Sequence, residues 1–174
     1  MAERNPGHTF MGRMLKPLTQ NERNATAGQG HAPEGGWGAM VPELDVSDIG
    51  ASLRFWCDLL GFAVAYDRPL AKFAYLEREG AQIMLCEING NWETGPLERP
   101  FGRGVNFQIA TQSLDPILKA LKDADWPLYR EPREAWYRIG NEPEEAGSRE
   151  FLVQDPDGYL VRFAESIGRR PVGG

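Results

Sequence analysis

The hydrophobic pattern of the chain becomes regular at the segment "VPELDVSD", which has the length and alternation of a short strand ending at a Ser/Asp cap. The next segment, "IGASLRFWCDLLG", has apolar residues at helical spacing and predicts a helix that closes at Gly61. The expected buried face of this helix consists of Ile49, Leu53, Trp56 and Leu60. Three segments of strand character follow: "FAVAYDRP", "KFAYLEREG" and "AQIMLCEI".

A second copy of this order follows the loop "NGNWETGPLERPFGRG". "VNFQIATQ" predicts a strand, and "SLDPILKALKDADW" predicts a helix that tolerates Pro116 in its first turn. Further strand material follows in "PLYREP", "AWYRIGN", "REFLVQD" and "YLVRFAE". The internal period is about 64 residues. We therefore expect an α+β fold of two βαβββ modules, at about residues 41–90 and 103–166, whose sheets join around a cleft.

Both ends of the chain lack this pattern. Residues 1–39 are rich in Gly, Asn and Pro, show no hydrophobic period, and contain both histidines, His8 and His31. They predict a flexible tail, or a cloning or start-site remnant, because Met40 directly precedes the first strand-like segment. The expected domain spans residues 40–168, and residues 169–174 form a short second tail.

Composition narrows the function classes. The net charge is −6 and the flanks are basic, so residues 40–168 are more acidic than the chain as a whole. This acidity argues against a nucleic-acid surface and is compatible with a cationic ligand. Because the sequence contains no long apolar run and no secretory-signal pattern, we expect no membrane contact and a cytoplasmic location. The spacing of Cys57 and Cys86 suits neither a zinc site nor a disulfide framework, so both are expected to be free thiols.

Two segments carry a resemblance to a known family. "VPELDVSDIGASLRFWCDLLGF" and "GSREFLVQDPDGYLVRFAE", together with the duplicated order, resemble the vicinal oxygen chelate superfamily of glyoxalases, bleomycin resistance proteins and dioxygenases. The bleomycin resistance proteins look most similar, and the resemblance covers about Val41 to Ile167. It implies a curved, mixed β-sheet cup with flanking helices that encloses a pocket, usually in a homodimer.

The enzymes of this superfamily hold a divalent metal with inward-pointing His and Glu side chains from four strands. By resemblance, the equivalent positions are approximately Val41, Met84 to Cys86, Val105 and Arg162. They supply no ligand set, and the permanent cation of Arg162 would repel a metal ion. Glu87 is expected on the outside or at an edge. We therefore expect no metal, no cofactor and no catalytic residues.

A drug-binding groove is the other arrangement that the resemblance implies. Tyr66 and Phe73 match aromatic residues of the groove in bleomycin resistance proteins, and Cys86 matches a small polar one. Phe107 lies within about one position of another groove aromatic. Phe73 and Phe107 would serve equally well as core residues.

The mouth of the groove departs from the family pattern. Some drug-binding relatives place a Trp next to Gly where this chain has Gly147 and Ser148. Trp136 could cover the same mouth, and Trp92 in the loop between the modules is another candidate, although loop tryptophans also pack on their own loop or on a dimer partner. The stretch "NEPEEAGSRE" adds three acidic ligand-binding candidates, or simply a solvated loop: Glu142, Glu144 and Glu145.

These observations favour a non-enzymatic, bleomycin-resistance-like protein. It would be a homodimer that binds and sequesters a glycopeptide drug or a similar cationic amphipathic small molecule, as in antibiotic resistance. One alternative is a metal-dependent glyoxalase-like or dioxygenase-like enzyme, a lyase or isomerase, with an unusual ligand set. The other is an interaction module that retains only the fold.

Overall fold

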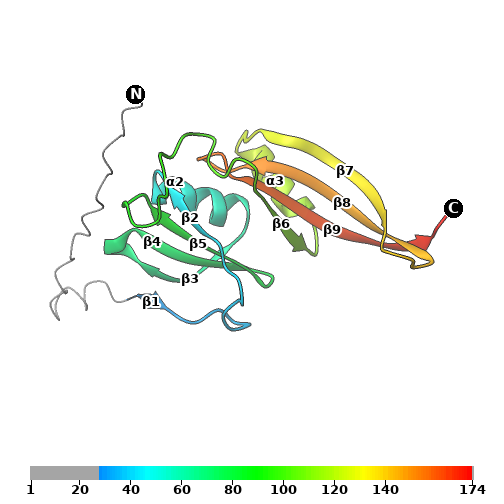
Figure 1. The fold of residues 1–174 in the computed structure, drawn as a ribbon, viewed down its shortest axis with the longest axis horizontal. Coiled ribbons are helices and arrows are strands. Elements are labelled where there is room, and N and C mark those ends of the chain that lie inside the picture. Colours follow the sequence, from blue (N-terminus) through cyan, green and yellow to red (C-terminus); the bar gives the residue numbers. More distant parts are fainter. Residues whose placement is uncertain (1–27, 174) are drawn as a thin grey trace, which may run out of the picture.

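Two β-sheets carry the fold, one from each half of the chain (Figure 1). The computed structural model describes residues 28–173. The strands of the first sheet are β1 (Gln29–Gly30), β2 (Glu43–Val46), β3 (Ala63–Arg68), β4 (Phe73–Arg78) and β5 (Ala81–Glu87). The strands of the second sheet are β6 (Asn106–Thr111), β7 (Leu128–Arg138), β8 (Glu144–Gln154) and β9 (Leu160–Pro171). The mixed α+β class expected from the sequence is therefore confirmed.

The strands are not arranged in sequence order. The first sheet has the order β1-β3-β4-β5-β2 and the second has the order β6-β9-β8-β7. Each sheet contains one parallel pair, β2 with β5 in the first sheet and β6 with β9 in the second. In each half of the chain, the strand before the helix therefore lies beside the last strand after it. A helix lies in the connection that follows β2 or β6, namely α2 (Ile49–Leu53) with its continuation η1 (Arg54–Leu59), and α3 (Asp115–Asp123). No helix among residues 28–173 is long and apolar enough to cross a membrane.

The first helix starts as expected but widens after one turn. The Asp48 carboxylate caps its N-terminus by accepting a backbone hydrogen bond of 2.8 Å from the first turn. In η1 the helix is of the π type, and the backbone N–H of Leu60 donates to the carbonyl of Phe55, five residues earlier. This wider turn brings Phe55 as well as Trp56 into the core, where each is no more than 1% exposed. The helix ends at Gly61, as expected, with a positive φ of 74°.

One hydrophobic core joins the two halves. The ring centroids of Phe55 and Trp126 are 4.9 Å apart, although one residue lies in η1 and the other follows α3. Phe151 on β8 and Phe163 on β9 stack at 5.6 Å within the same core. The alternate residues of the first sheet supply the opposite wall: Leu44, Val46, Ala74, Leu76, Ile83 and Leu85. One face of each sheet is therefore buried against the helices.

The "DPDG" turn fastens the halves together. The buried Asp155 carboxylate accepts hydrogen bonds from the backbone N–H groups of Asp157 and Tyr159, at 3.0 and 2.9 Å. Its other oxygen accepts a hydrogen bond of 3.4 Å from the Trp56 indole of the first half. The first carboxylate of the motif therefore both shapes the turn and links it to the first half of the chain.

The second carboxylate of the turn makes a separate bridge. Asp157, 1% exposed, accepts a hydrogen bond of 2.8 Å from the backbone N–H of Ser47 and forms an ion pair of 2.6 Å with Arg99. Gly158 completes the turn at a φ of 95°, where a Cβ atom would lie 2.4 Å from the side chain of Pro100. A glycine is therefore required here for conformation and for space.

The N-terminal boundary lies earlier than we expected. Residues 28–39 were assigned to a flexible tail, but β1 pairs with β3, matching Gly30 to Tyr66. Farther along, the backbone N–H of Gly38 donates to Gln82 at 2.6 Å. This segment is therefore part of the folded unit. The rest of the expected tail, including His8, lies outside the described residues.

The second sheet also extends beyond its expected limits. "PLYREP" and "AWYRIGN" join into the single strand β7, whose pairing with β8 shifts on both sides of Arg130. Pro132 is tolerated because β7 is an edge strand. β9 continues to Pro171, past the expected end of the domain at residue 168, because Arg169 and Arg170 still pair with β8. The three long strands form the curved arm that ends near the C-terminus in Figure 1.

Candidate functional site

The first sheet carries a second hydrophobic cluster on the face opposite the main core. Its buried members are Phe73, Tyr75 and Cys86, each less than 9% exposed. Tyr66 and Met84 are half-buried and pack against them. Three ligand-binding candidates, Tyr66, Phe73 and Cys86, are therefore brought together on one surface, which we call the aromatic face.

Strand pairing explains why these residues meet. Tyr66 on β3 pairs with Tyr75 on β4, which pairs with Met84 on β5 and through it with Glu43 on β2. A neighbouring row runs in the same way through Arg68, Phe73, Cys86 and Asp45. Because side chains alternate between the two faces of a sheet, both rows point away from the main core.

The aromatic rings of these rows contact one another closely. The rings of Tyr66 and Tyr75 stack at 5.4 Å with an interplanar angle of 22°, and Tyr66 lies 5.7 Å from Phe73. Trp37, from the segment before β2, meets Tyr66 and Tyr75 edge-on at 5.7 and 5.1 Å. Offset stacking and edge contacts of this kind are favourable for aromatic rings, so the face presents a firm aromatic surface.

The two ends of the aromatic face carry opposite charge. At the β3 end, the Arg68 guanidinium lies over the rings of Tyr66 and Phe73, at 5.6 and 5.1 Å. At the β2 end are the carboxylates of Glu43 and Asp45. Burial, with the negative charge of Glu93, raises the pKa of Asp45, and its Oδ1 atom has no hydrogen-bond partner among residues 28–173. This oxygen is buried, and the described residues leave it without a hydrogen bond.

The Cys86 thiol lies in the middle of the face. Its sulfur accepts a hydrogen bond of 3.2 Å from the Asn89 side chain. Burial, together with the negative charges of Glu43 and Asp45, raises the pKa of this thiol. Because the thiolate is the nucleophilic form, the environment of Cys86 suits a polar contact rather than covalent catalysis.

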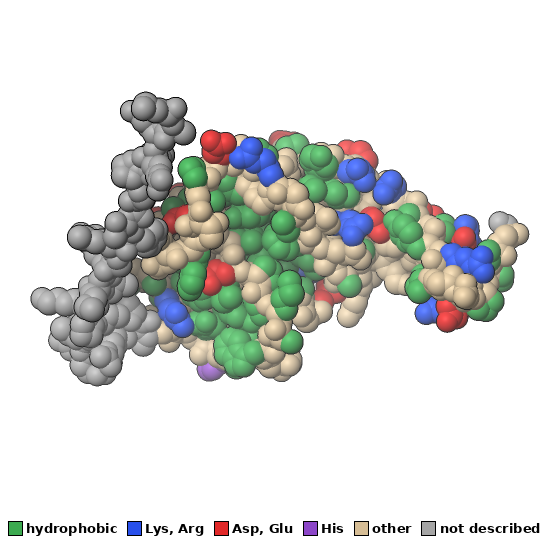
Figure 2. Space-filling model, in the orientation of Figure 1, with side chains coloured by type: hydrophobic (Ala, Val, Ile, Leu, Met, Phe, Trp, Pro, Cys, Tyr) green, Lys and Arg blue, Asp and Glu red, His purple; other side chains and the backbone are tan. Residues whose placement is uncertain are grey.

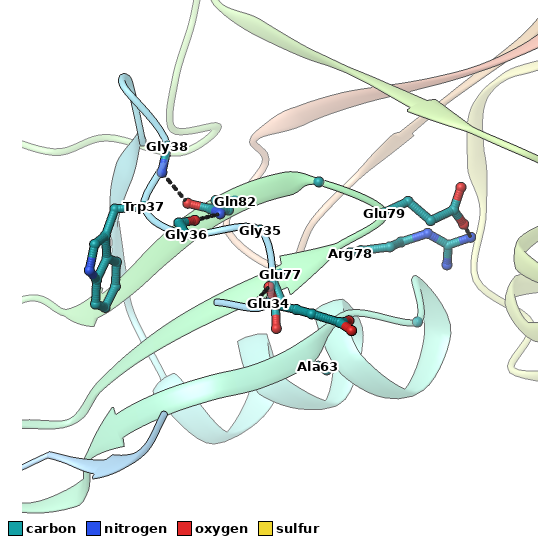
Figure 3. A pocket seen from close by; sticks show the side chains of 12 residues that line it. Glu34, Gly35, Gly36, Trp37, Gly38, Ala63, Glu77, Arg78, Glu79 and Gln82 are labelled. Carbon is teal, nitrogen blue, oxygen red and sulfur yellow. Dashed lines mark hydrogen bonds and ion pairs between the residues drawn. The ribbon is translucent and has the colours of Figure 1, made fainter. Parts of the chain in front are cut away.

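A cavity of about 680 Å³ with charged side chains on its walls lies beside the aromatic face, between residues 34–38 and the β4–β5 hairpin (Figure 3). At one end Arg78 and Glu79 form an ion pair of 2.9 Å, and elsewhere Glu77 accepts a hydrogen bond of 3.1 Å from the backbone N–H of Glu34. The remaining walls are largely glycine backbone: Gly35, Gly36, Gly38, Gly61 and Gly80. Small-molecule sites are mostly apolar with a few polar groups, so the aromatic face is the better candidate.

The outward face of the second sheet is polar. Arg162 donates a hydrogen bond to the side chain of Gln108 and lies 3.7 Å from a carboxylate oxygen of Glu150. Glu150 is only 3% exposed. Arg162 is therefore held by neighbours on β6 and β8.

The positions that the resemblance equates with metal ligands carry side chains of the wrong chemistry. Val41 and Val105 each precede a strand, and Arg162 supplies a cation. No group of three or more His, Cys, Asp or Glu residues in the described part of the chain could hold a metal ion. Glu87 accepts hydrogen bonds from Lys72 and from the backbone N–H of Ile49, which lowers its pKa and uses its carboxylate at the start of α2. Within residues 28–173, the side chains at these positions do not fit a divalent metal.

Six of the predicted ligand-binding residues lie outside the aromatic face, and Phe107 and Trp92 are two of them. Phe107 on β6 packs against the main core, 6.4 Å from the ring of Tyr159. Trp92 is 64% exposed in the loop between the halves and does not belong to the aromatic cluster. Phe107 lies on the same face of β6 as the buried Ile109, so the period of the strand would have placed it with the core.

Trp136 and the acidic loop lie on the long arm. Trp136 packs against Gly147 of β8, where a Cβ atom would come within 2.7 Å of the indole, and Arg170 covers its ring at 4.2 Å. The carboxylates of the acidic loop are partly neutralised, since Glu144 pairs with Arg169 at 3.7 Å and Glu145 pairs with Arg170 at 2.9 Å. Glu142 is exposed. Red and blue side chains accordingly alternate at the end of the arm in Figure 2.

Several residues of the aromatic face were missed by the sequence argument. Tyr75 follows Phe73 by two positions, so the period of a strand would have placed both on one face. Asp45 and Arg68 become neighbours of this cluster only through strand pairing, which sequence does not reveal. Trp37 was missed because its segment was taken as a tail. Hydrophobic side chains gather over this half of the molecule in Figure 2.

Comparison with known proteins agrees with this architecture. A bleomycin resistance protein from Geobacillus stearothermophilus is 26% identical over 141 residues, covering 73% of this chain and 96% of that protein. A probable lactoylglutathione lyase from Synechocystis sp. is 25% identical over 136 residues, covering 73% and 94%. The crystal structure of TioX from Micromonospora sp. ML1 has the same fold, with a TM-score of 0.57, 17% identity, and coverage of 75% of this chain and 100% of that one.

A family model also matches the chain. The model described as the Glyoxalase/Bleomycin resistance protein/Dioxygenase superfamily matches residues 41–163, which is most of the chain. The relatives named above include both a resistance protein and a lyase, at nearly equal identity. The chain therefore belongs to the glyoxalase/bleomycin resistance protein/dioxygenase superfamily.

Proposed function

We propose that the protein binds a flat, partly aromatic small molecule on the aromatic face and sequesters it without chemistry, in the manner of a bleomycin resistance protein. The observation that carries this proposal is the stacked pair Tyr66 and Tyr75 with Phe73 beside them, at 5.4 and 5.7 Å from Tyr66. Tyr66 is the half-buried member of this set, and its buried neighbours hold it in place, so a planar ring can stack on it without requiring the side chains to reorganise.

The charges at the β2 end support a ligand with a cationic group. Glu43 is exposed, and Asp45 carries a carboxylate oxygen without a protein partner. The negative charges of these two side chains would attract a protonated amine or guanidinium while the aromatic part of the ligand covers Tyr66. Glycopeptide drugs of the bleomycin class combine these two features, and a relative at 26% identity is named a bleomycin resistance protein.

Sequestration is favoured over catalysis by the chemistry of the same side chains. The raised pKa of Cys86 keeps it as a thiol near neutral pH, so it is a poor nucleophile. The superfamily's metal chemistry requires ligands where this chain has apolar side chains and the Arg162 cation. A metal-dependent lyase would need metal-ligating side chains at these positions, and this chain does not supply them there.

We further propose that the two strand–helix–three-strand units are equivalent βαβββ modules and that the protein acts as a homodimer. In a single chain, the outward faces of the two sheets are covered only in part. A second copy would bring the polar face around Arg162 and the aromatic face of another chain to opposite walls of one groove. Closed twofold pairs are the commonest assemblies of such chains.

Calorimetric titration of the full-length protein with metal-free bleomycin tests the proposed function. We expect saturable binding at about one drug per chain, in the micromolar range or tighter. Tyr66→Ala should weaken it, and Trp92→Ala, which alters an exposed tryptophan outside the aromatic cluster, should not. An absence of binding by the parent protein would overturn the resistance function.

A further inference from the structure

Residues 28–40 form a strap across the first sheet and precede the segment that matches the superfamily. Three anchors hold it. β1 pairs with β3, the backbone N–H of Gly38 donates to the Gln82 side-chain oxygen at 2.6 Å, and the Gln82 amide donates to the carbonyl of Gly36 at 2.7 Å. Gln82 lies between these two glycines in Figure 3. The strap therefore has a defined position, fixed by one side chain of β5.

Trp37 lies at the centre of the strap. The same Gln82 oxygen accepts a hydrogen bond of 2.6 Å from the Tyr75 hydroxyl, so the anchor of the strap is also part of the aromatic face. The Trp37 indole rests edge-on against Tyr66 and Tyr75 and remains 60% exposed. Because its edge contacts with Tyr66 and Tyr75 hold the indole in place and most of its surface is open to solvent, Trp37 is positioned to contact a ligand.

A pocket of about 360 Å³ opens between the strap and β3. Its side-chain walls are the rings of Trp37 and Tyr66, the imidazole of His31 and the guanidinium of Arg68. Arg68 is exposed and contacts the faces of Tyr66 and Phe73. No salt bridge within residues 28–173 involves it.

We infer that this pocket binds a planar aromatic acid. The ring of the ligand packs against Trp37 and Tyr66, and its acidic group forms an ion pair with Arg68, while His31 contributes a ring nitrogen for a hydrogen bond. A guanidinium that lies over aromatic rings and has no carboxylate partner suits a carboxylate, sulfonate or phosphate attached to a flat ring. This inference goes beyond the proposed sequestration of a drug and does not depend on it.

The test uses two probes of equal size and opposite charge, 1-naphthoate and 1-naphthylmethylamine, titrated into the full-length protein by calorimetry. We expect naphthoate to bind at least about tenfold more tightly than the amine, which corresponds to one well-formed ion pair. Trp37→Ala should weaken naphthoate binding by about tenfold, and Trp37→Phe should restore most of it. Arg68→Gln should remove the preference for naphthoate over the amine.

Gln82→Ala provides an independent arm because it changes no wall of the pocket. It removes the two hydrogen bonds that fix the strap, so naphthoate binding should fall as it does in Trp37→Ala, while the unfolding midpoint shows that the fold persists. Trp92→Ala is the matched control and should bind naphthoate like the parent. Equal affinity for the two probes, or unchanged naphthoate binding in Trp37→Ala, would overturn the inference. If the protein binds naphthoate in a Trp37-dependent way but does not bind bleomycin, only the proposed drug function is refuted.

Discussion

The indole N–H of Trp56 donates a hydrogen bond to the buried carboxylate of Asp155, 99 residues away in the sequence, and so links the two halves of the fold. Burial raises the pKa of Asp155 to about 6, although the hydrogen bonds from Tyr159, Asp157 and Trp56 act in the opposite direction. Asp155 therefore both links the two halves of the fold and changes its protonation state with pH.

This pKa predicts a distinctive pH dependence of stability. Between about pH 4 and pH 6 the folded protein holds a proton on Asp155 that the unfolded chain has released, so acidification through this window favours folding. The contribution is up to about 3 kcal/mol in the free energy of unfolding. Urea unfolding of the parent and Asp155→Asn at several pH values measures it. The difference between the two should shrink as pH rises from 4 to 6, and the exposed Asp123→Asn control should follow the parent. Parallel curves for the parent and Asp155→Asn would contradict the assignment.

Tyr66 should control how long an aromatic drug stays bound. It is the half-buried member of the stacked pair with Tyr75, and Phe73 lies largely beneath the Arg68 guanidinium. Tyr66→Ala should raise the dissociation rate of bleomycin by an amount equivalent to roughly 1–3 kcal/mol of lost contact, with little change in the association rate. Stopped-flow measurements provide both rates, and Tyr66→Phe should behave like the parent. A Tyr66→Ala protein with an unchanged dissociation rate would show that the drug binds elsewhere.

The acidic end of the aromatic face, rather than the acidic loop, should attract a cationic ligand. Glu144 and Glu145 already face arginines, so changing Glu142, Glu144 and Glu145 together to Gln should alter bleomycin affinity by less than about threefold. Asp45→Asn should weaken binding by about tenfold and reduce its dependence on salt, because screening acts on the remaining charge–charge attraction. Calorimetry on both variants at 0.1 M and 1 M salt measures these effects. The Debye length is roughly 10 Å at the lower salt concentration and roughly 3 Å at the higher one. A larger effect from the triple loop variant would instead support the acidic loop as the mouth of the groove, as the sequence suggested.

Both cysteines should alkylate slowly near neutral pH. Burial raises the pKa of Cys57 to about 11, and burial with nearby carboxylates also raises that of Cys86. A free thiol has a pKa of about 8.5, so its alkylation rate levels off above that pH. Mass spectrometry after iodoacetamide treatment should show that the alkylation rates of both cysteines continue to rise at higher pH. Saturating bleomycin should protect Cys86 but not Cys57. Rapid modification of Cys86 at pH 7 would instead indicate an activated thiol.

The full-length protein should sediment as a dimer at micromolar concentration. Obligate interfaces in homodimers bury extensive apolar surface, and a groove shared by two copies would cover the aromatic face. Sedimentation velocity distinguishes the dimer from the monomer mass of 19.5 kDa. A single monomeric species across the concentration range would leave the groove to one chain alone.

Local patterns predicted the strands and helices well because alternation and helical spacing follow directly from which side must face the core. Tyr66, Phe73 and Cys86 were placed together through the resemblance, and the pairing of β3, β4 and β5 brings them onto one surface. Phe107 shares the buried face of β6 with Ile109, so the period of the strand pointed to the core, where Phe107 packs near Tyr159. The role of Asp155 was not visible in the sequence, because its partner lies on another element.

The strap was the largest departure from expectation, and the reason is physical. Its residues bury little apolar surface of their own, so they show no hydrophobic period, and they are held by backbone and side-chain hydrogen bonds to the first sheet. Order of this kind depends on a partner surface and leaves almost no trace in a segment's own sequence.

The position of the strap outside the matched region affects how the protein would be prepared for study. A clone begun at Val41, where similarity to the superfamily starts, would retain every strand except β1 but omit Trp37 and release Gln82 from both of its glycine partners. Such a protein could pass every check of folding and still bind ligands differently from the natural chain. Libraries screened against trimmed domains of this superfamily would then assign the wrong ligand preference to proteins that carry a similar extension.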